Sequence, residues 1–204
     1  MPDRIWLPNP PEGTSICLGF DGSINNDWTG ISGQTMAGYS FTPRIGKDRL
    51  PSFWDPKAHG DRIPHGEVSA AVDELFTRFD VVRMYCDPED WDTDIENWAL
   101  EHGEEHVIAW ETNRPKQMYE EIRRFEADLR EGRITHDGCP IATAHVFNAR
   151  KVAKPGQRYT LGKPNENQKI DAAMTRILAN TAARDALAAG WEPPKAKPKV
   201  RVWR

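Results

Sequence analysis

ICLGFDGS, residues 16–23, is an apolar run that ends in an acidic, glycine-containing turn. The run at 16–20 predicts a buried strand, and Asp21 ends it. VVRMYCDP, residues 81–88, has the same form, with Asp87 directly after the apolar run. If these two strands are parallel neighbours, Asp21 and Asp87 emerge side by side at one edge of a sheet, where sites of α/β proteins form.

The rest of the chain alternates between helix and strand patterns. Residues 64–79 repeat apolar side chains at helical spacing, and Pro64 suits the first turn. The same reasoning predicts helices over 90–101, 115–130, 140–150 and 168–188, one or two strands within 27–42, a long loop over 43–63, short strands over 107–110 and 157–162, and a turn at 136–138. Intermixed strands and helices predict an α/β domain with a mixed sheet.

Composition limits the class of protein. The chain has 204 residues and a mass of 23.2 kDa, and we expect an extended leader over 1–14, one domain over 15–190 and a basic tail over 191–204. No apolar run could span a membrane, the start lacks a signal-peptide core, and three scattered cysteines give no disulfide framework. With 27 Lys and Arg against 31 Asp and Glu, any contacts with nucleic acid must be local or metal-mediated.

A third acidic residue falls at the start of the last predicted helix. Asp171 shares a helical line with Met174 and Leu178, and we expect that line to face the sheet. Clustered carboxylates repel one another, and a hard cation such as Mg²⁺ or Mn²⁺ removes the conflict. Two such ions, about 3.5–4 Å apart, can hold a phosphate that is to be cleaved. The pattern therefore predicts a catalytic metal site of Asp21, Asp87 and Asp171.

Simpler interpretations stay open for each acid. Asp21 with Gly22 and Ser23 can be only a turn. Asp87 can be a strand end that caps the next helix, and Asp171 can be a favourable charge at a helix N-terminus. The coincidence of all three favours the metal site.

Further candidates surround these positions. Asp27 can reach a metal or order a substrate, or it can simply begin a strand. His145 and Asn148, three residues apart on one predicted helix face, can contact a phosphate or orient a ligand, or form a structural pair. Four cations before Asp171 are expected to bind DNA phosphates unless they are ordinary solvated side chains; they are Arg150, Lys151, Lys163 and Lys169.

Taken in order, these motifs resemble the nuclease domain of phage terminase large subunits. The opening strand is LGFDGS at 18–23 with DWT at 27–29, and the second acidic motif is YCDP at 85–88, followed by Trp91. Later segments that resemble the family are RITHDG at 133–138, AHVFNA at 144–149 and KIDAA at 169–173.

The resemblance implies an RNase H-like mixed sheet flanked by helices, and a metal-dependent endonuclease that cleaves double-stranded phage DNA during genome packaging. It implies that Asp21, Asp87 and Asp171 bind Mg²⁺ or Mn²⁺. It also implies that the partners are double-stranded DNA, a packaging ATPase domain, the portal and the small terminase subunit, in the cytoplasm of the infected host. We expect the ATPase to be absent from this chain, because the nearest stretch to a phosphate loop, 156–164, has the wrong spacing.

The same residues are compatible with other classes of function. Another RNase H-like nuclease, such as a junction resolvase or RNase H, is separated only by substrate tests. A non-catalytic docking module of the packaging machine also stays open, and the basic tail can contribute to it. An actin-like ATPase also has an acidic phosphate loop, but it needs a second glycine-rich loop that is missing here.

Overall fold

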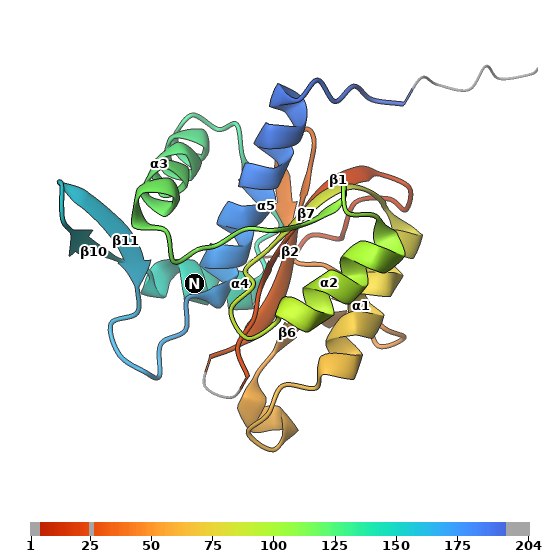
Figure 1. Cartoon of the computed structure of the whole chain (residues 1–204), viewed down its shortest axis with the longest axis horizontal. Coiled ribbons are helices and arrows are strands. Elements are labelled where there is room, and N and C mark those ends of the chain that lie inside the picture. Colours follow the sequence, from red (N-terminus) through yellow and green to blue (C-terminus); the bar gives the residue numbers. More distant parts are fainter. Residues whose placement is uncertain (1–4, 25–26, 195–204) are drawn as a thin grey trace, which may run out of the picture.

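A seven-stranded mixed sheet forms the centre of the molecule in this computed structural model, which describes residues 5–24 and 27–194 (Figure 1). Its strands are β1 (Ser15–Asp21), β2 (Thr29–Thr35), β3 (Tyr39–Phe41), β6 (Phe53–Trp54), β7 (Asp80–Cys86), β8 (Val107–Ala109) and β9 (Thr135–His136). They run in the order β8-β7-β1-β2-β3-β9, with β6 paired to β2. Two hairpins lie outside this sheet, β4 (Arg44–Ile45) with β5 (Leu50–Pro51) and β10 (Arg150–Lys154) with β11 (Arg158–Gly162).

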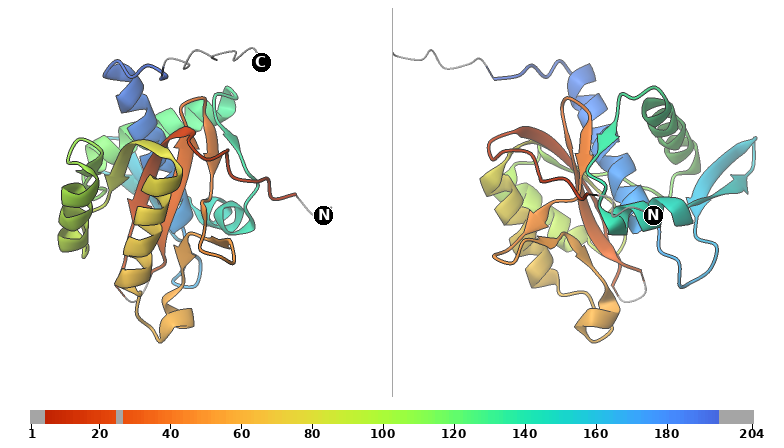
Figure 2. Two further views of the ribbon diagram at one scale, coloured as in Figure 1. Left: turned by 90° about the vertical axis from the view of Figure 1, so that its right-hand side faces the viewer. Right: turned by 180° about the vertical axis from the view of Figure 1, so that it is seen from behind.

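Helices cover both faces of the sheet (Figure 2). On one face lie α1 (His65–Arg78) and α2 (Asp92–His102), and a short 3-10 helix, η1 (Pro56–His59), precedes α1. On the other face lie α3 (Pro115–Arg130) and α5 (Asp171–Ala188), with α4 (Pro140–Asn148) beside α5. The expected α/β fold, a mixed sheet flanked by helices, is confirmed. Among the described helices, none has the length and apolar content that a membrane crossing requires.

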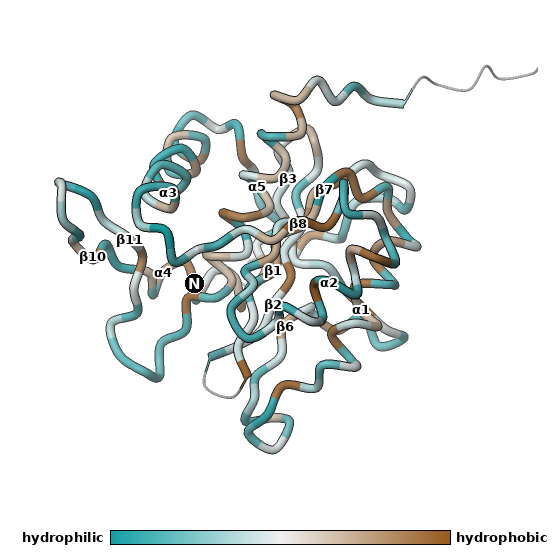
Figure 3. The backbone as a smooth tube through the Cα atoms, in the orientation of Figure 1, coloured by the Kyte–Doolittle hydropathy of each residue, from teal (hydrophilic) through white to brown (hydrophobic). Residues whose placement is uncertain are grey.

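β1 lies at the centre of the sheet and contributes side chains to the hydrophobic cores on both of its faces. It runs parallel to β7, with Phe20 opposite Cys86, and antiparallel to β2, which confirms the parallel arrangement considered from the sequence. Alternation along the strand sends Ile16, Leu18 and Phe20 into the core under α1 and α2, and Cys17 into the core under α3 and α5. Figure 3 shows the result, with hydrophobic residues gathered toward the sheet and hydrophilic residues on the outer turns of the helices.

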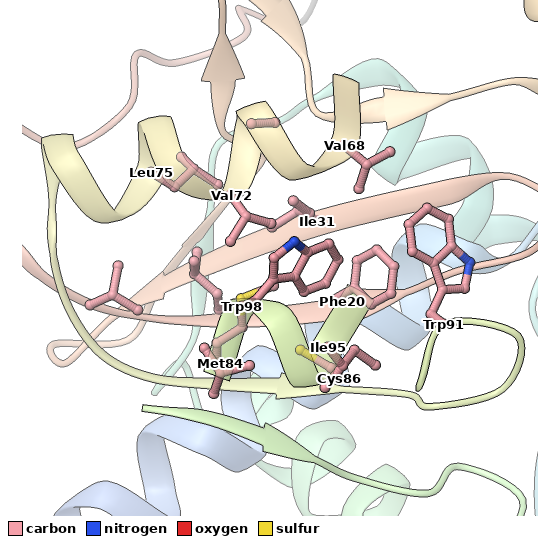
Figure 4. Close-up of a cluster of buried hydrophobic side chains, with 14 of the residues drawn as sticks. Phe20, Ile31, Val68, Val72, Leu75, Met84, Cys86, Trp91, Ile95 and Trp98 are labelled. Atoms are coloured by element: carbon pink, nitrogen blue, oxygen red, sulfur yellow. The ribbon is translucent and has the colours of Figure 1, made fainter. Parts of the chain in front are cut away.

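The core under α1 and α2 fixes the chain that follows β7. Phe20 meets the rings of Trp91 and Trp98 edge to face, with centroid distances of 5.0 and 5.1 Å (Figure 4). Such aromatic pairs contribute about 0.5–1.5 kcal/mol each beyond the burial of their area. Because Trp91 is fully buried at the start of α2, the short segment between Asp87 and that helix has little freedom.

The helix α5 lies directly on β1. An added Cβ at Gly19 would lie 2.2 Å from the carbonyl oxygen of Thr175 and 2.5 Å from the backbone nitrogen of Ala179. Only glycine permits this close approach. A buried hydrogen bond of 2.7 Å between the hydroxyls of Ser32 and Thr175 ties the same helix to β2. The start of α5 is therefore held near the end of β1.

A buried ion pair ties α5 to the far edge of the sheet. Arg176 donates to Asp137 at 2.7 Å, and both side chains are almost completely buried. The same carboxylate accepts hydrogen bonds from the backbone N–H groups of Thr42 and Cys139 and from the indole of Trp6, at 2.8, 3.1 and 3.0 Å. Asp137 is thus fully satisfied, and it joins the segment before β1, the sheet and α5.

Several short elements differ from the sequence predictions. The predicted loop over 43–63 contains β4, β5, β6 and η1, and the predicted turn at 136–138 overlaps β9, which pairs with β3. The helix expected over 140–150 ends at Asn148 because Arg150 begins β10, and α5 begins at Asp171 instead of 168. Two-residue strands carry no period of their own and form only through pairing with a neighbour. Of the basic tail, residues 195–204 lie outside the described residues.

Replacing Asp137 with alanine is expected to destabilise the domain by about 3–5 kcal/mol at pH 7, because Arg176 is left buried without its partner. Burial raises the pKa of Asp137, but Arg176 and the N–H donors lower it more, so the pKa lies below its ordinary value of 3.8. Such a carboxyl stabilises the fold above its ordinary pKa and loses that contribution as the pH falls. Urea unfolding should therefore show a difference between the two proteins that shrinks below pH about 4. A difference that does not change with pH would contradict this role.

Replacing Gly19 with alanine should destabilise the domain by about 1–3 kcal/mol or more, because the added methyl group pushes α5 off β1. Gly66→Ala is the matched control, since that glycine lies in α1 with open space around it and a negative φ. The control should be neutral or stabilising by up to about 1 kcal/mol. Urea unfolding measures both, and a Gly19→Ala protein as stable as the control would show that the contact is looser than described.

Candidate active site

The three predicted aspartates line one cleft, which opens where β1 and β7 end and α5 begins. Its volume is about 360 Å³. Asp21 is the last residue of β1, Asp87 follows β7, and Asp171 is the first residue of α5. The other lining residues are Gly22, Ser23, Asp27, Glu89, Asp90, Thr112, Leu161, Gly162, Lys163, Ile170 and Met174. Three distant parts of the sequence therefore place carboxylates in one polar cleft.

The carboxyl of Asp21 is perturbed both by burial and by its acidic neighbours. Burial raises its pKa well above the ordinary value, and the charges of Asp171 and Asp87 raise it further. The next residue, Gly22, has no room for a side chain, because an added Cβ would lie 2.4 Å from the indole nitrogen of Trp91. Packing beside the cleft therefore requires glycine at position 22, in addition to any role of this residue in a turn.

Asp87 is held by a residue that the sequence reasoning missed. The hydroxyl and the backbone N–H of Thr112 both donate to its carboxylate, the N–H at 3.4 Å. Burial raises the pKa of Asp87, and the bonds from Thr112 oppose that effect only in part. Thr112 lies just after β8, which runs parallel to β7 and ends at the same edge. Its position after a third parallel strand is the signal that could have found it.

Asp171 has a buried carboxylate oxygen without a hydrogen-bond partner. Its side chain is about nine-tenths buried, and its Oδ2 atom has no hydrogen-bond partner. Burial is the main cause of a pKa raised from 3.8 to about 7, and the negative charge of Asp27 acts in the same direction. A hydrogen bond from the residue's own backbone and the charges of Lys169 and Lys163 oppose the rise. A buried oxygen without a hydrogen-bond donor lowers the stability of the fold unless a ligand binds to it.

The residues present fit a hard divalent cation. The polar side chains that line the cleft are mostly carboxylates, together with two hydroxyls and one lysine, and Mg²⁺ and Mn²⁺ prefer such oxygen donors. Neighbouring carboxylates contribute to the raised pKa values of both Asp21 and Asp171, and bound positive charge removes that repulsion. The unpartnered Oδ2 of Asp171 provides a ready ligand atom.

The three aspartates are spread more widely than ligands of a single ion. Within the described part of the chain, the one set of three acidic or thiol or imidazole ligand atoms that all lie within 4.8 Å of one another is elsewhere, at Asp73, Glu101 and His102 of α1 and α2. Oxygens that bind one Mg²⁺ directly lie about 2.1 Å from it, so no two are more than about 4.2 Å apart. The spacing of the three aspartates therefore suits two ions, or one that keeps intervening waters.

Asp27 and two of the predicted DNA-binding lysines form one ion cluster at the cleft. Lys163 donates to both carboxylate oxygens of Asp27, at 2.7 and 2.9 Å, and Lys169 donates at 2.7 Å. Burial raises the pKa of Asp27, but the bonds from the two lysines lower it more, so it stays ionised. Lys163 also pairs with Glu166 at 2.9 Å. These contacts tie the loop before β2 to the segment before α5.

The other predicted cations lie on the β10–β11 hairpin, which projects from the body of the molecule (Figure 1). Arg150 donates to the carbonyls of Phe147 and Ala149, and Lys151 pairs with Glu126 of α3 at 2.8 Å. Neither is among the described residues that line the cleft. Glu89 and Asp90, which the motif reasoning did not single out as ligands, do line it, as members of the acidic loop after β7.

His145 and Asn148 are also outside the described lining of the cleft, and they contact the chain that leads to Asp171. Nδ1 of His145 accepts a hydrogen bond from the backbone N–H of Ala172 at 3.1 Å. Asn148 donates to the carbonyl of Lys169 at 2.9 Å. Burial, and to a smaller extent the positive charge of Lys169, lowers the pKa of His145 from 6.5 to about 4, so the ring is neutral near pH 7. The approach of His145 to Asp171, 3.7 Å, is therefore not an ion pair.

The chain is similar in sequence to phage proteins. It is 31% identical over 187 residues to the Gene 13 protein of Mycobacterium phage D29, a match that covers 86% of this chain and 30% of the relative. The chain thus spans less than a third of the length of that relative. No family model matches the chain.

Solved structures share the fold at low sequence identity. The large terminase nuclease from thermophilic phage G20c superposes with a TM-score of 0.64 and 13% identity, over 87% of this chain and 92% of that one. That nuclease has also been solved with bound magnesium and with bound cobalt. The HK97 bacteriophage large terminase gives a TM-score of 0.61 and 20% identity, over 86% of this chain and 40% of that one. This chain therefore has the RNase H-like fold of phage large terminase nuclease domains.

Proposed function

We propose that this domain is a metal-dependent endonuclease that cleaves double-stranded phage DNA during genome packaging. The observation that carries the proposal is that Asp21, Asp87 and Asp171 line one cleft, where the other two acids help to raise the pKa of Asp21. The fold and the similarity to phage proteins support the same conclusion. A docking module would have no reason to bury such unfavourable charge, which favours an enzyme over that alternative.

The protein's part in this reaction is to hold charge in a fixed place. Asp21, Asp87 and Asp171 would bind Mg²⁺ or Mn²⁺, as two ions, and Thr112 would fix the orientation of Asp87. The cations would supply Lewis acidity, which activates an attacking water and stabilises the charge that develops on the phosphate. Lys163, at the wall of the cleft, would contact the DNA backbone.

The proposal extends to the biological setting. We propose that the partners are double-stranded DNA, a packaging ATPase domain, the portal and the small terminase subunit, and that the protein works in the cytoplasm of the infected host. The modest net charge of −4 fits a nuclease that other components deliver to DNA, because it does not favour strong binding by electrostatics alone.

Changing any one of the three aspartates to asparagine should lower the rate of Mg²⁺- or Mn²⁺-dependent cleavage by about 10²-fold or more. The charge that holds the cation is lost, while the shape of the side chain is kept. Nicking and linearisation of supercoiled plasmid measure this. Asp73→Asn is the matched control, since it removes one carboxylate from the separate cluster on α1 and α2. The control should cleave like wild type, and circular dichroism should show that every variant is folded.

Two results would count against this assignment. Cleavage that survives Asp21→Asn but is lost in Asp73→Asn would place the metal at the cluster on α1 and α2 instead of in the cleft. Preference for a four-way junction or an RNA–DNA hybrid over linear duplex would keep the chemistry but replace the substrate, and would identify the domain as a different RNase H-like nuclease.

Replacing Lys163 with glutamine should weaken the binding of duplex DNA and reduce its salt dependence. Loss of one phosphate contact lowers the slope of log affinity against log salt by about 0.9. Fluorescence anisotropy over a range of NaCl concentrations, with Ca²⁺ in place of Mg²⁺ to prevent cleavage, measures the slope. Lys47→Gln, on the turn between β4 and β5, is the control and should leave it unchanged. Equal slopes for both variants would show that Lys163 does not contact the DNA backbone.

A further inference from the structure

The start of α5 lacks a cap of its own. Its N-cap residue is Ile170, which makes no side-chain hydrogen bond to the helix. The first backbone N–H groups of a helix need partners from outside the helix. Those of Ala173 and Met174 reach the carbonyl of Ile170, at 2.8 and 3.3 Å, whereas that of Ala172 turns to His145. A ring on α4 thus performs the task that a serine or aspartate usually performs at this position.

His145 is built firmly into this place. Only 5% of the residue is exposed, and its ring meets Trp28 edge to face at 5.2 Å and Phe53 at 6.1 Å. Since Nδ1 accepts the N–H of Ala172, the ring proton must be on Nε2. One turn further along α4, Asn148 binds the carbonyl of Lys169, so the helix holds the chain on both sides of Ile170.

We propose that His145 is a positioning residue of the candidate site, which caps α5 from α4 and so keeps the carboxylate of Asp171 available to a divalent cation. An aspartate in the first turn of a helix is itself attracted to unpaired N–H groups there. With the N–H of Ala172 occupied by the ring, Oδ2 of Asp171 has no competing donor and remains a ligand atom. Without the ring, that N–H would draw the carboxylate back toward the helix. The inference rests on the proposed metal-dependent function.

Three substitutions separate this role from simple packing. Asparagine places its amide oxygen where histidine has Nδ1, so His145→Asn keeps the acceptor for Ala172. Glutamine places its amide near the Nε2 position, and alanine has none, so His145→Gln and His145→Ala lose that acceptor. His106→Ala is a matched control, because Nδ1 of His106 also bonds to the backbone, at the carbonyl of Val82, but away from the cleft.

The primary measurement is Mn²⁺ affinity of the whole chain by isothermal titration calorimetry, with plasmid nicking as a separate readout. We expect His145→Ala and His145→Gln to weaken Mn²⁺ binding by about 10–100-fold and to raise the Mn²⁺ concentration that half-saturates nicking. His145→Asn should bind close to wild type. His106→Ala should also do so, even where it lowers the melting temperature.

Each outcome decides the matter. Unchanged Mn²⁺ affinity in His145→Ala, or an equal loss in His145→Asn and His145→Ala, overturns the capping role whatever the nicking assay gives. Binding of Mn²⁺ that follows the expected order in a wild-type protein that cuts no DNA supports the capping role and rejects the nuclease function. A wild-type protein that binds no Mn²⁺ overturns both.

Discussion

The contact of α5 with β1 is the constraint on which the rest of the structure depends. Gly19 lets the helix backbone lie against the strand backbone, with no side chain between them. The side of α5 that meets the sheet carries small residues, among them Ala172, Ala179 and Ala182, all fully buried. Because the helix is so close and its first residue is Asp171, that carboxylate lies beside the end of β1. A larger residue at position 19 would move Asp171, at the start of α5, away from Asp21, at the end of β1.

Two buried aspartates differ in how their carboxylates are satisfied. Asp137 receives donors from Arg176, Trp6 and two backbone N–H groups, and its pKa lies below the ordinary value. Asp171 is similarly buried, but its Oδ2 has no donor and its pKa is raised to about 7. Arg176 and Asp171 lie on the same helix, so the ion pair of Arg176 with Asp137 holds in place the helix that carries Asp171. Apolar burial in the two cores supplies folding energy that can offset the repulsion in the cleft.

The sequence was sufficient for the features that depend on local pattern. The apolar runs before Asp21 and Asp87 define strand ends, and helical spacing defines most of α5, so the meeting of the three aspartates could be expected. Thr112 and the pairing of Asp27 with Lys163 could not, because they depend on where loops from different strands meet. The strand β10 was missed because all five of its residues are exposed, so it has no apolar alternation to reveal it.

The contacts of α4 with the start of α5 fix the part of the site that the sheet does not hold. The three aspartates come from elements that meet only at their ends, and ends are where helices fray and strands lose pairing. β1 and β7 are fixed there by their pairing and by the aromatic core, whereas α5 has no cap in its own sequence. The ring of His145 and the amide of Asn148 supply that missing order from a neighbouring helix. Since the carboxylates are spread more widely than the direct ligands of one ion, a small displacement of the start of α5 would change which of them a cation can reach.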